Sequence, residues 1–469
     1  MRSHPRHRLT RRALVKGAAA LSAATALGGL VPRSARTAQA ATGATPITAA
    51  TTAPLSAQAK FSGTLSAWGV VSFTKEGDAL LGQQMADWGR QHNVQVEYSP
   101  LPGSDYFAKV AAAVEAGALP DVVMMLGDQT IFYATQGKLV DLTDIFGEIK
   151  TRAGGIYKTL LPYVTVNDKI YAVPMEADVT CMYARLDLCE KVTGKREPPV
   201  TLDALEEIAR KVQNPPTLYG IGLPIGRTPD TTGNLTLMIY ADGGTLVDGH
   251  GRPHLENTGV ISALTRAKRW WTDKLIQPDS PSADDAWNNN AYQSHRAAFV
   301  FNPASIFAWL EKNDQDLLKL TSQAPFPKGS AGVSAQQAGT WSWAVSASSK
   351  NAAAAKALIK DIMQPKGLEA VYEKVGGRWY PVYMDLSRAD FWKKRPFFDL
   401  FPGIIEHARP DWYPAPAAPQ LLTQLSAARQ KFILADMVQD VCLNGKSPEA
   451  AAKAAQVKME QAFQEALRK

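Results

Sequence analysis

Strand-like and helix-like segments alternate along this chain from Phe61 onward, and this alternation constrains the fold more than any other feature. Strands are expected where apolar and polar residues alternate, and helices where apolar residues recur every three or four positions. The expected elements are strands over residues 63–68, 94–98 and 121–126 and helices over residues 77–92 and 104–116. Such an order predicts a parallel sheet with helices on both faces.

The second half of the chain continues the pattern. Its expected elements are a strand over residues 179–183, a helix capped at Thr201 and running to Val212, helices over residues 235–241 and 259–274, and an almost wholly helical stretch from residue 365 to the amphipathic segment 448–467. A chain of 469 residues is long enough for two lobes. We therefore expect two α/β lobes with a helical C-terminus.

The net charge of +7 comes from the N-terminus and not from the body of the protein. The first forty residues hold eight basic side chains and no acidic one, whereas basic and acidic residues nearly balance in the remainder. A balanced body lacks the basic surface that phosphate backbones require. We therefore expect no nucleic-acid partner.

The N-terminus has the layout of an export signal. A basic stretch precedes the small apolar run of residues 18–30, and Ala38-Gln39-Ala40 fits a cleavage site. The run is too short to span a bilayer, which takes roughly 20 residues. The pair Arg11-Arg12 resembles the twin-arginine motif, so residues 1–40 are predicted to be a twin-arginine signal peptide and residues 41–60 a flexible leader. The mature protein is expected to be soluble in the periplasm or outside the cell.

Three cysteines, Cys181, Cys189 and Cys442, are an odd number at long spacings. They exclude a disulfide framework and lack the clustering that a metal site needs. We predict buried thiols and no bound metal.

Several short motifs occur in a fixed order. They are residues 116–123 (AGALPDVV), 137–142 (GKLVDL), 171–178 (YAVPMEAD), 198–205 (PPVTLDAL), 242–244 (DGG) and 376–381 (GGRWYP). In order and spacing they resemble extracellular solute-binding proteins of family 1, the maltose-binding-protein-like receptors of ABC importers, with Leu202 in place of the usual Trp. The resemblance covers Phe61 to the C-terminus.

This resemblance implies a type II periplasmic-binding-protein fold with a ligand cleft between the lobes. The N-terminal lobe would comprise residues 61–175 and 340–370, and the C-terminal lobe residues 176–339 and 371–469. It also implies a monomer that closes by hinge motion around a sugar or oligosaccharide and delivers it to a membrane permease, without a cofactor.

Candidate ligand contacts lie where strands end or crossovers begin. They are Trp68, Asp128, Glu176, Asp178, Asn234, Asn302, Trp341, Arg378 and Trp379. Carboxylates and Asn can pair with sugar hydroxyls, and an indole covers the apolar face of a pyranose. Some of these residues have a structural alternative. The Trp side chains would then pack in the core, and Asp128 and Glu176 would form a helix cap or a hinge ion pair. Arg378 would select an acidic sugar if it faces the cleft, and residues 411–413 would close one rim.

No sequence motif indicates catalysis. The chain lacks Gly-x-Ser-x-Gly, His-Glu-x-x-His and phosphate-binding loops, and we expect no catalytic residue. The adjacent carboxylates Glu206-Glu207 and Asp284-Asp285 could in principle serve a glycosidase, but Glu206-Glu207 is interpreted as solvated charge on a helix surface. A carbohydrate-active enzyme and a chemoreceptor-type sensor on the same fold are the alternatives to a transport receptor.

The export signal gives the first prediction. Replacing both arginines (Arg11→Lys with Arg12→Lys) should leave the precursor in the cytoplasm, because the receptor of this route reads the pair. Cell fractionation and immunoblotting measure the distribution. Export of the double variant at the normal rate would contradict the assignment.

Overall fold

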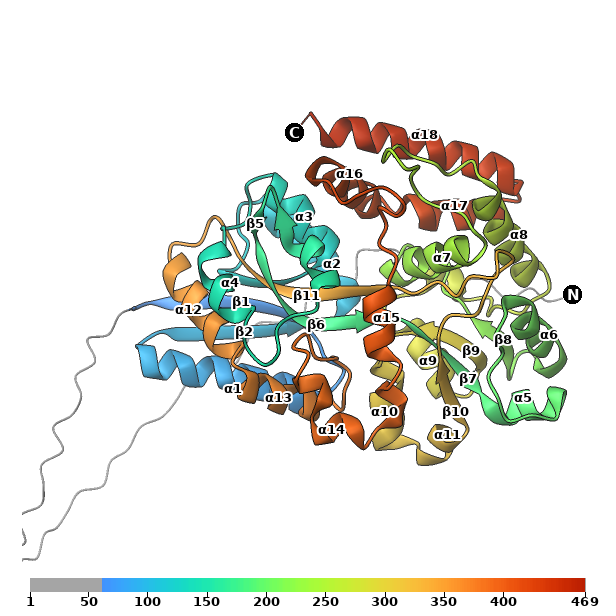
Figure 1. Cartoon of the computed structure of the whole chain (residues 1–469), viewed down its shortest axis with the longest axis horizontal. Helices are drawn as coiled ribbons and strands as arrows, with labels where there is room; N and C mark the ends of the chain where they lie inside the picture. The colour runs from blue at the N-terminus through green and yellow to red at the C-terminus, as the bar shows by residue number, and fades with distance from the viewer. Residues whose placement is uncertain (1–60, 469) are drawn as a thin grey trace, which may run out of the picture. The chain divides into compact units, whose positions relative to one another are not determined.

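A computed structural model describes residues 61–468, so the predicted signal peptide and leader lie outside the described residues. Residues 61–468 fall within one contact unit, which contains two larger sheets and one two-stranded ribbon. Figure 1 shows the two sheets with their helices.

The first sheet has the strand order β2-β1-β3-β11-β6. Its strands are β1 (Thr64–Val70), β2 (Gln95–Leu101), β3 (Val122–Leu126), β6 (Ala172–Val179) and β11 (Ala338–Val345). β1 pairs in parallel with β2 and β3, which confirms the predicted parallel arrangement for the first three strands. β11 runs antiparallel to both β3 and β6, so β6 has the same direction as the first three strands and the parallel prediction was wrong for β11. The reason is that β11 arrives from the second sheet and enters this one from the opposite end.

Helices cover both faces of this sheet, as predicted. They are α1 (Lys75–His92), α2 (Gly103–Glu115), α3 (Gly127–Thr135), α4 (Thr143–Ile149), α12 (Ala352–Ile362) and α13 (Pro365–Lys374). Because β1 lies between β2 and β3, right-handed crossovers carry α1 and α2 to opposite faces. Figure 1 shows α1 and α13 below the strands and α2 and α3 above them. The ribbon β4 (Thr165–Val166) with β5 (Lys169–Ile170) follows the 3₁₀ helix Lys158–Val164.

The second sheet has the order β10-β7-β9-β8. Its strands are β7 (Cys181–Arg185), β8 (Tyr219–Gly222), β9 (Ala297–Asn302) and β10 (Thr321–Ala324). Its helices are α5 (Leu186–Thr193), α6 (Leu202–Val212), α7 (Pro229–Ala241), α8 (Thr258–Thr272), α9 (Trp287–Gln293), α10 (Ser305–Asn313) and α11 (Gln315–Lys319). Thr201 caps α6 as predicted, its hydroxyl accepting from the Ala204 amide at 3.1 Å. α7 begins six residues before the predicted start, behind the capping Thr228.

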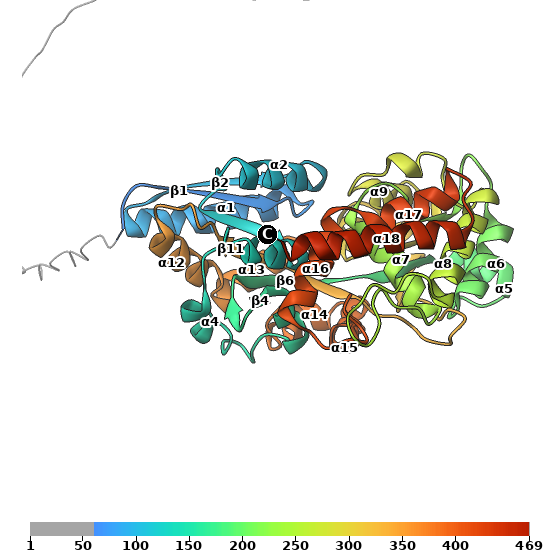
Figure 2. The same ribbon diagram turned by 90° about the horizontal axis from the view of Figure 1, so that it is seen from above.

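Two connecting segments carry the chain between the sheets before the C-terminal helices. Thr180 alone separates β6 from β7, and residues 325–337 separate β10 from β11. The later helices are α14 (Asp390–Lys393), α15 (Phe401–His407), α16 (Pro419–Gln430), α17 (Ile433–Cys442) and α18 (Pro448–Ala466). α16 packs on α3, whereas α17 and α18 pack on α8 (Figure 2). The C-terminal region is helical as predicted, although turns and short 3₁₀ segments interrupt it before α15.

The DGG motif marks a close approach of two backbones. A Cβ atom on Gly259, near the start of α8, would lie 2.0 Å from the Gly244 nitrogen. Only glycine permits this contact, which fixes α8 against the turn that ends α7.

The three cysteines are free and buried, which confirms the predicted role as packed thiols. Within residues 61–468, no helix combines the length and the apolar composition that crossing a membrane requires.

Glu206 contradicts its interpretation as a solvated surface charge, since only 10% of its side chain is exposed. Arg269 donates two hydrogen bonds to it at 2.6 Å, Arg210 one at 2.7 Å and Trp270 Nε1 one at 2.8 Å. Burial alone would raise its pKa, but these donors outweigh burial and lower the pKa to about 2. The carboxylate therefore joins α6 to α8. Glu207, with 65% of its side chain exposed, fits the original interpretation.

This network gives a stability prediction. Glu206→Gln should lower the free energy of unfolding by about 2 kcal/mol at neutral pH, because it leaves buried donors facing an amide. The folded pKa lies below the ordinary value of 4.5, so the carboxylate stabilises the fold above about pH 4.5 and loses this effect as pH falls toward about 2. Denaturant unfolding at several pH values measures the difference.

Glu207→Gln is the matched control on the same helix, and its effect should be near zero because exposed pairs contribute little. Equal effects of the two variants, or an effect of Glu206→Gln that persists unchanged in acid, would contradict the assigned network.

Candidate functional site

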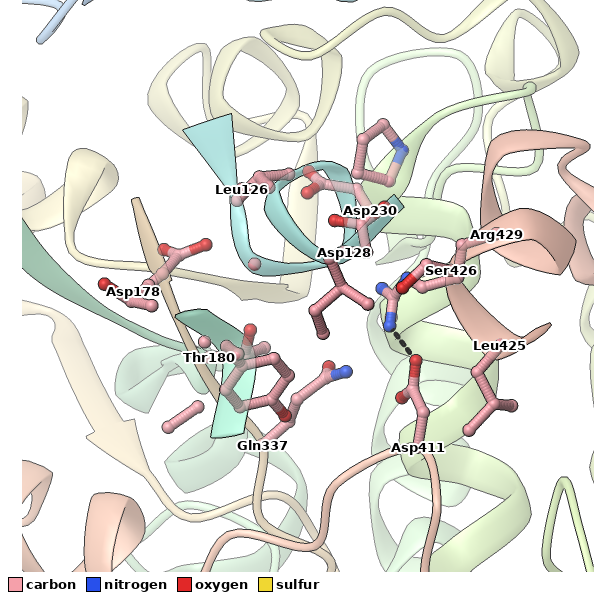
Figure 3. Close-up of a pocket in the computed structure, with 18 of the residues that line it drawn as sticks. Leu126, Asp128, Asp178, Thr180, Asp230, Gln337, Asp411, Leu425, Ser426 and Arg429 are labelled. Carbon is pink, nitrogen blue, oxygen red and sulfur yellow. Dashed lines mark hydrogen bonds and ion pairs between the residues drawn. The ribbon is translucent and has the colours of Figure 1, made fainter. Parts of the chain in front are cut away.

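A cavity of about 110 Å³ lies where the first sheet, the second sheet and α16 meet. The ends of β3 and β6, the start of β11, and the first turns of α3 and α7 all contribute to its wall. Figure 3 shows Asp178, Thr180 and Gln337 from the crossovers on one side and Ser426 and Arg429 of α16 on the other. The polar side chains in the lining are Asp128, Tyr163, Asp178, Thr180, Asp230, Asn234, Gln337, Thr340, Asp411, Ser426 and Arg429.

Two helices begin at this cavity, and each carries an Asp as its second residue. Asp128 lies in the first turn of α3 and Asp230 in the first turn of α7. A carboxylate at this position is stabilised by the positive end of the helix dipole. The sequence therefore delivers two acidic groups to the wall.

Asp128 joins α3 to α16, since Gln430 Nε2 donates to its Oδ2 at 2.8 Å. Burial raises the pKa of Asp128, while the charge of Arg429 opposes the rise. Asp128 is not the N-cap of α3, which is Leu126, but it lies in the first turn after β3 and links this helix to α16.

Arg429 forms an ion pair with Asp411, drawn as the dashed line in Figure 3. Burial tends to lower the pKa of Arg429, but the charges of Asp411 and Asp128 raise it above its ordinary value. The Arg429 guanidinium is therefore charged and forms its ion pair with Asp411. Asp411 and Trp412 lie in the cavity wall. They belong to the segment 411–413, which was predicted to close one rim of the cleft.

Asp178 and Asp230 face the same cavity from β6 and α7. Asn288 Nδ2 donates to Asp230 Oδ2 at 2.8 Å, and Asp178 Oδ1 is buried without a hydrogen-bond partner. Burial raises the pKa of Asp178, and Arg378 opposes this rise. Asp230 therefore has one protein partner, whereas one oxygen of Asp178 has none.

Asn234 and Glu176 also carry unpaired polar atoms. Asn234 lines the cavity, is only 3% exposed, and its Nδ2 has no partner. Glu176 lies two residues before Asp178 on β6, is fully buried, and neither carboxyl oxygen has a partner. Buried polar groups are normally paired, so such atoms indicate a missing partner.

Asn302 lies behind the wall and positions other side chains. It does not line the cavity but accepts from Asn288 Nδ2 at 2.9 Å and donates to Asn289 Oδ1 at 2.7 Å. Since Asn288 in turn holds Asp230, Asn302 acts through its neighbours.

The three predicted stacking tryptophans do not line this cavity. Trp341 packs against Tyr106 and Phe107, each with ring centroids 5.9 Å away. Trp379 is fully buried, and Trp68 is half-buried beneath Lys109, whose Nζ lies 4.4 Å from the ring centroid. The aromatic residues that do line the cavity are Tyr163, Phe301 and Trp412.

Arg378 also lies outside the lining, with its guanidinium 5.8 Å from the Phe73 ring centroid. Its Nε and Nη1 are buried without partners. Its charge nevertheless influences Glu176, Asp178, Asp230 and Asp285, so it lies behind the acidic wall.

A second cavity of about 400 Å³ adjoins the first, sharing Leu126, Asp128, Pro229 and Arg429 with it. Phe107 of α2 and Asp284 and Asp285 of the second-sheet side contribute to its wall.

Sequence reasoning did not find Thr180, Asp230, Gln337, Ser426 and Arg429. A helix-start signal was available for Asp230, because Thr228-Pro229-Asp230 has a cap followed by Pro and an acidic residue. No local pattern shows that α16 returns to α3, so Arg429 and Ser426 carried no usable signal.

Comparisons with known proteins agree with this architecture. The family model described as bacterial extracellular solute-binding protein matches residues 83–398, more than half of the chain. A probable ABC transporter-binding protein of Deinococcus radiodurans is 28% identical over 262 residues, which cover 52% of this chain. The matched part of our chain spans 60% of that relative's length.

Solved structures of similar fold include the maltose-bound MalE3 of T. maritima (21% identity, TM-score 0.72) and a Thermotoga lettingae solute-binding protein with α-D-tagatose (23%, 0.74). A sugar transporter protein from Arthrobacter chlorophenolicus with laminaribiose is 15% identical with a TM-score of 0.75. Each match covers 85% of this chain and 99% of the other. They confirm the predicted two-lobed α/β fold with a helical C-terminal region. By its match over residues 83–398, the chain belongs to the bacterial extracellular solute-binding protein family.

Proposed function

We propose that this protein is the substrate-binding component of an ABC importer, which captures a sugar or oligosaccharide between its lobes and delivers it to a membrane permease. The observation that carries the proposal is a pair of buried polar atoms without partners in the cavity lining, Asn234 Nδ2 and Asp178 Oδ1. Such atoms cost folding free energy and are compensated when a ligand with hydroxyl groups pairs with them.

The ligands named for similar proteins favour a sugar. Proteins of the same fold hold maltose, α-D-tagatose and laminaribiose, and the curated relative is named as an ABC transporter-binding protein. For this chain we extend that chemistry to the cavity lined by Asp128, Asp178 and Asn234. Glu176, Asn302 and Arg378 support these contacts from behind, and Trp68, Trp341 and Trp379 belong to packing.

The two lobes are proposed to comprise residues 61–175 with 340–370 and residues 176–339 with 371–469. The short crossover at Thr180 and the longer one at residues 325–337 are the positions where backbone rotation would change the lobe angle. The protein would work as an exported monomer, without enzymatic turnover. A carbohydrate-active enzyme on this fold is the competing function, because carboxylates line the cavity.

Ligand capture gives a thermal-shift prediction. One sugar in a broad panel of mono- and oligosaccharides should raise the melting temperature by about 5 °C at roughly 1,000 times its dissociation constant, since this concentration adds about 4 kcal/mol to the folded state. Asn234→Ala should reduce this shift with only a small change in the unliganded melting temperature, because the Asn234 Nδ2 donates no hydrogen bond within the protein.

Trp341→Ala is the contrasting variant. It should lower unliganded stability by about 3 kcal/mol, because the ring is 6% exposed and packed against Tyr106 and Phe107. Responses only to amino acids, peptides or metal ions would contradict the sugar proposal. Turnover of a chromogenic glycoside would favour the enzyme instead.

Hinge closure gives a further prediction. Small-angle scattering should record a smaller radius of gyration at saturating sugar than without it, because a ligand bound by both lobes favours the closed arrangement. Asn234→Ala at the same sugar concentration is the control for ligand occupancy. An unchanged radius at proven saturation would contradict closure but not binding.

A further inference from the structure

Carboxyl groups outnumber cations around the proposed ligand site. Glu176 and Asp178 of β6, Asp230 of α7 and Asp285 before α9 influence one another's ionisation, which places the four in one acidic cluster. Asp178 and Asp230 line the first cavity, and Asp285 lines the adjoining one. The cluster thus surrounds empty space large enough for a ligand.

Three guanidinium groups lie near this cluster, and the charge of one of them, Arg378, opposes the rise in pKa of all four carboxyl groups. Arg429 is paired with Asp411, and Arg227 lies 3.1 Å from Asp436 through its Nε. Arg378 acts on the cluster through space, but its Nε and Nη1 donate no hydrogen bond to it. Among residues 61–468, no ion pair joins any of the four carboxyl groups to Lys, Arg or His.

A second, independent feature points to a ligand in the same space. The Asn234 amide lines the cavity, is only 3% exposed, and its Nδ2 donor has no acceptor. The wall therefore presents a free amide donor together with carboxyl groups that have no ion-pair partner among the described residues. A ligand that satisfies both needs an oxygen acceptor and a cationic donor.

We infer that the cavity selects a sugar or polyol that bears a protonated amine, held between Asp178 and Asp230, with Asn234 donating to a neighbouring hydroxyl. The inference rests on the proposed sugar-binding function and deepens it. An ammonium group pairs with carboxylates through charge-assisted hydrogen bonds, which are about twice as strong as neutral ones. A neutral sugar supplies hydroxyl donors but no positive charge that could stabilise the ionised form of these buried carboxyl groups.

Protonation linkage supports the inference. Burial raises the pKa of Asp230 to about 8, Asp285 and Asp178 add to the rise, and Asn288 and Arg378 oppose it. An ammonium beside Asp230 favours the charged carboxylate and lowers this pKa, so binding should release protons. Affinity for the amine should therefore rise by up to about tenfold per pH unit from about pH 6 toward pH 8 while the amine stays protonated.

The test uses matched pairs of amine and neutral sugars in isothermal titration calorimetry. The pairs are glucosamine with glucose, galactosamine with galactose, mannosamine with mannose, and β1,4-linked glucosamine oligomers with both their N-acetylated forms and the corresponding glucose oligomers. At least one amine should bind about tenfold or more tightly than its neutral counterparts at about pH 6. Titration in buffers of different ionisation enthalpy should detect the released proton.

Two variants locate the preference. Asp178→Asn and Asp230→Asn should each reduce the amine's affinity by about tenfold while changing the affinity of its neutral partner far less. Glu207→Gln, an exposed carboxylate outside both cavities, should leave both affinities unchanged. Melting temperatures confirm that each variant is folded.

The outcomes separate the inference from the proposed function. A neutral sugar that binds as tightly as its amine counterpart would overturn the inference and leave sugar binding intact. An amine preference that survives both Asp variants would also overturn it. If no sugar of either kind binds, the proposed function fails together with the inference.

Discussion

The pairing of β6 with β11 is the constraint on which the rest of this structure depends. The two strands pair along the whole of β6, from Ala172 to Val179. At the cavity end, Thr180 connects β6 to the second sheet, and residues 325–337 connect that sheet to β11. Because β11 is an interior strand, bonded to β3 on one side and to β6 on the other, any change in this pairing would disturb both the sheet and the crossovers. The register also sets Asp178 opposite Gly339. Because glycine has no side chain beyond hydrogen, it leaves the space beside Asp178 to the cavity, which both residues line.

The local elements of this fold were predictable because their signals are local. Residues 77–92 and 201–212 space their apolar side chains for helices, and the structure has α1 and α6 there. The antiparallel entry of β11 was not predictable from such patterns, since a strand's direction depends on where the preceding crossover ends. The start of α7 was missed because Thr231 to Asn234 lack apolar spacing, although Thr228 and Pro229 carried a start signal.

The site was only partly predictable for the same reason. Asp128, Asp178 and Asn234 follow strand ends or precede a helix core, so sequence order places them near the cavity, and they line it. The tryptophans were poor markers, because a large apolar ring gains as much free energy in a core as against a sugar. Trp341 and Trp379 are buried within the protein instead. Arg429 reaches the wall through the packing of α16 on α3, a contact with no sequence signature.

Glu206 and Glu176 are both buried, but they differ in their hydrogen-bond partners and in the direction of their pKa shifts. Glu206 accepts from Arg269, Arg210 and Trp270, so its charge is compensated within the protein and its pKa is lowered to about 2. Glu176 has no partner for either oxygen, and burial followed by the charge of Asp178 raises its pKa well above the ordinary value. Leaving such a group unpaired costs folding free energy. The fold tolerates this cost at Glu176, which lies behind the cavity wall next to Asp178, whereas the three donors to Glu206 remove it at the α6–α8 contact.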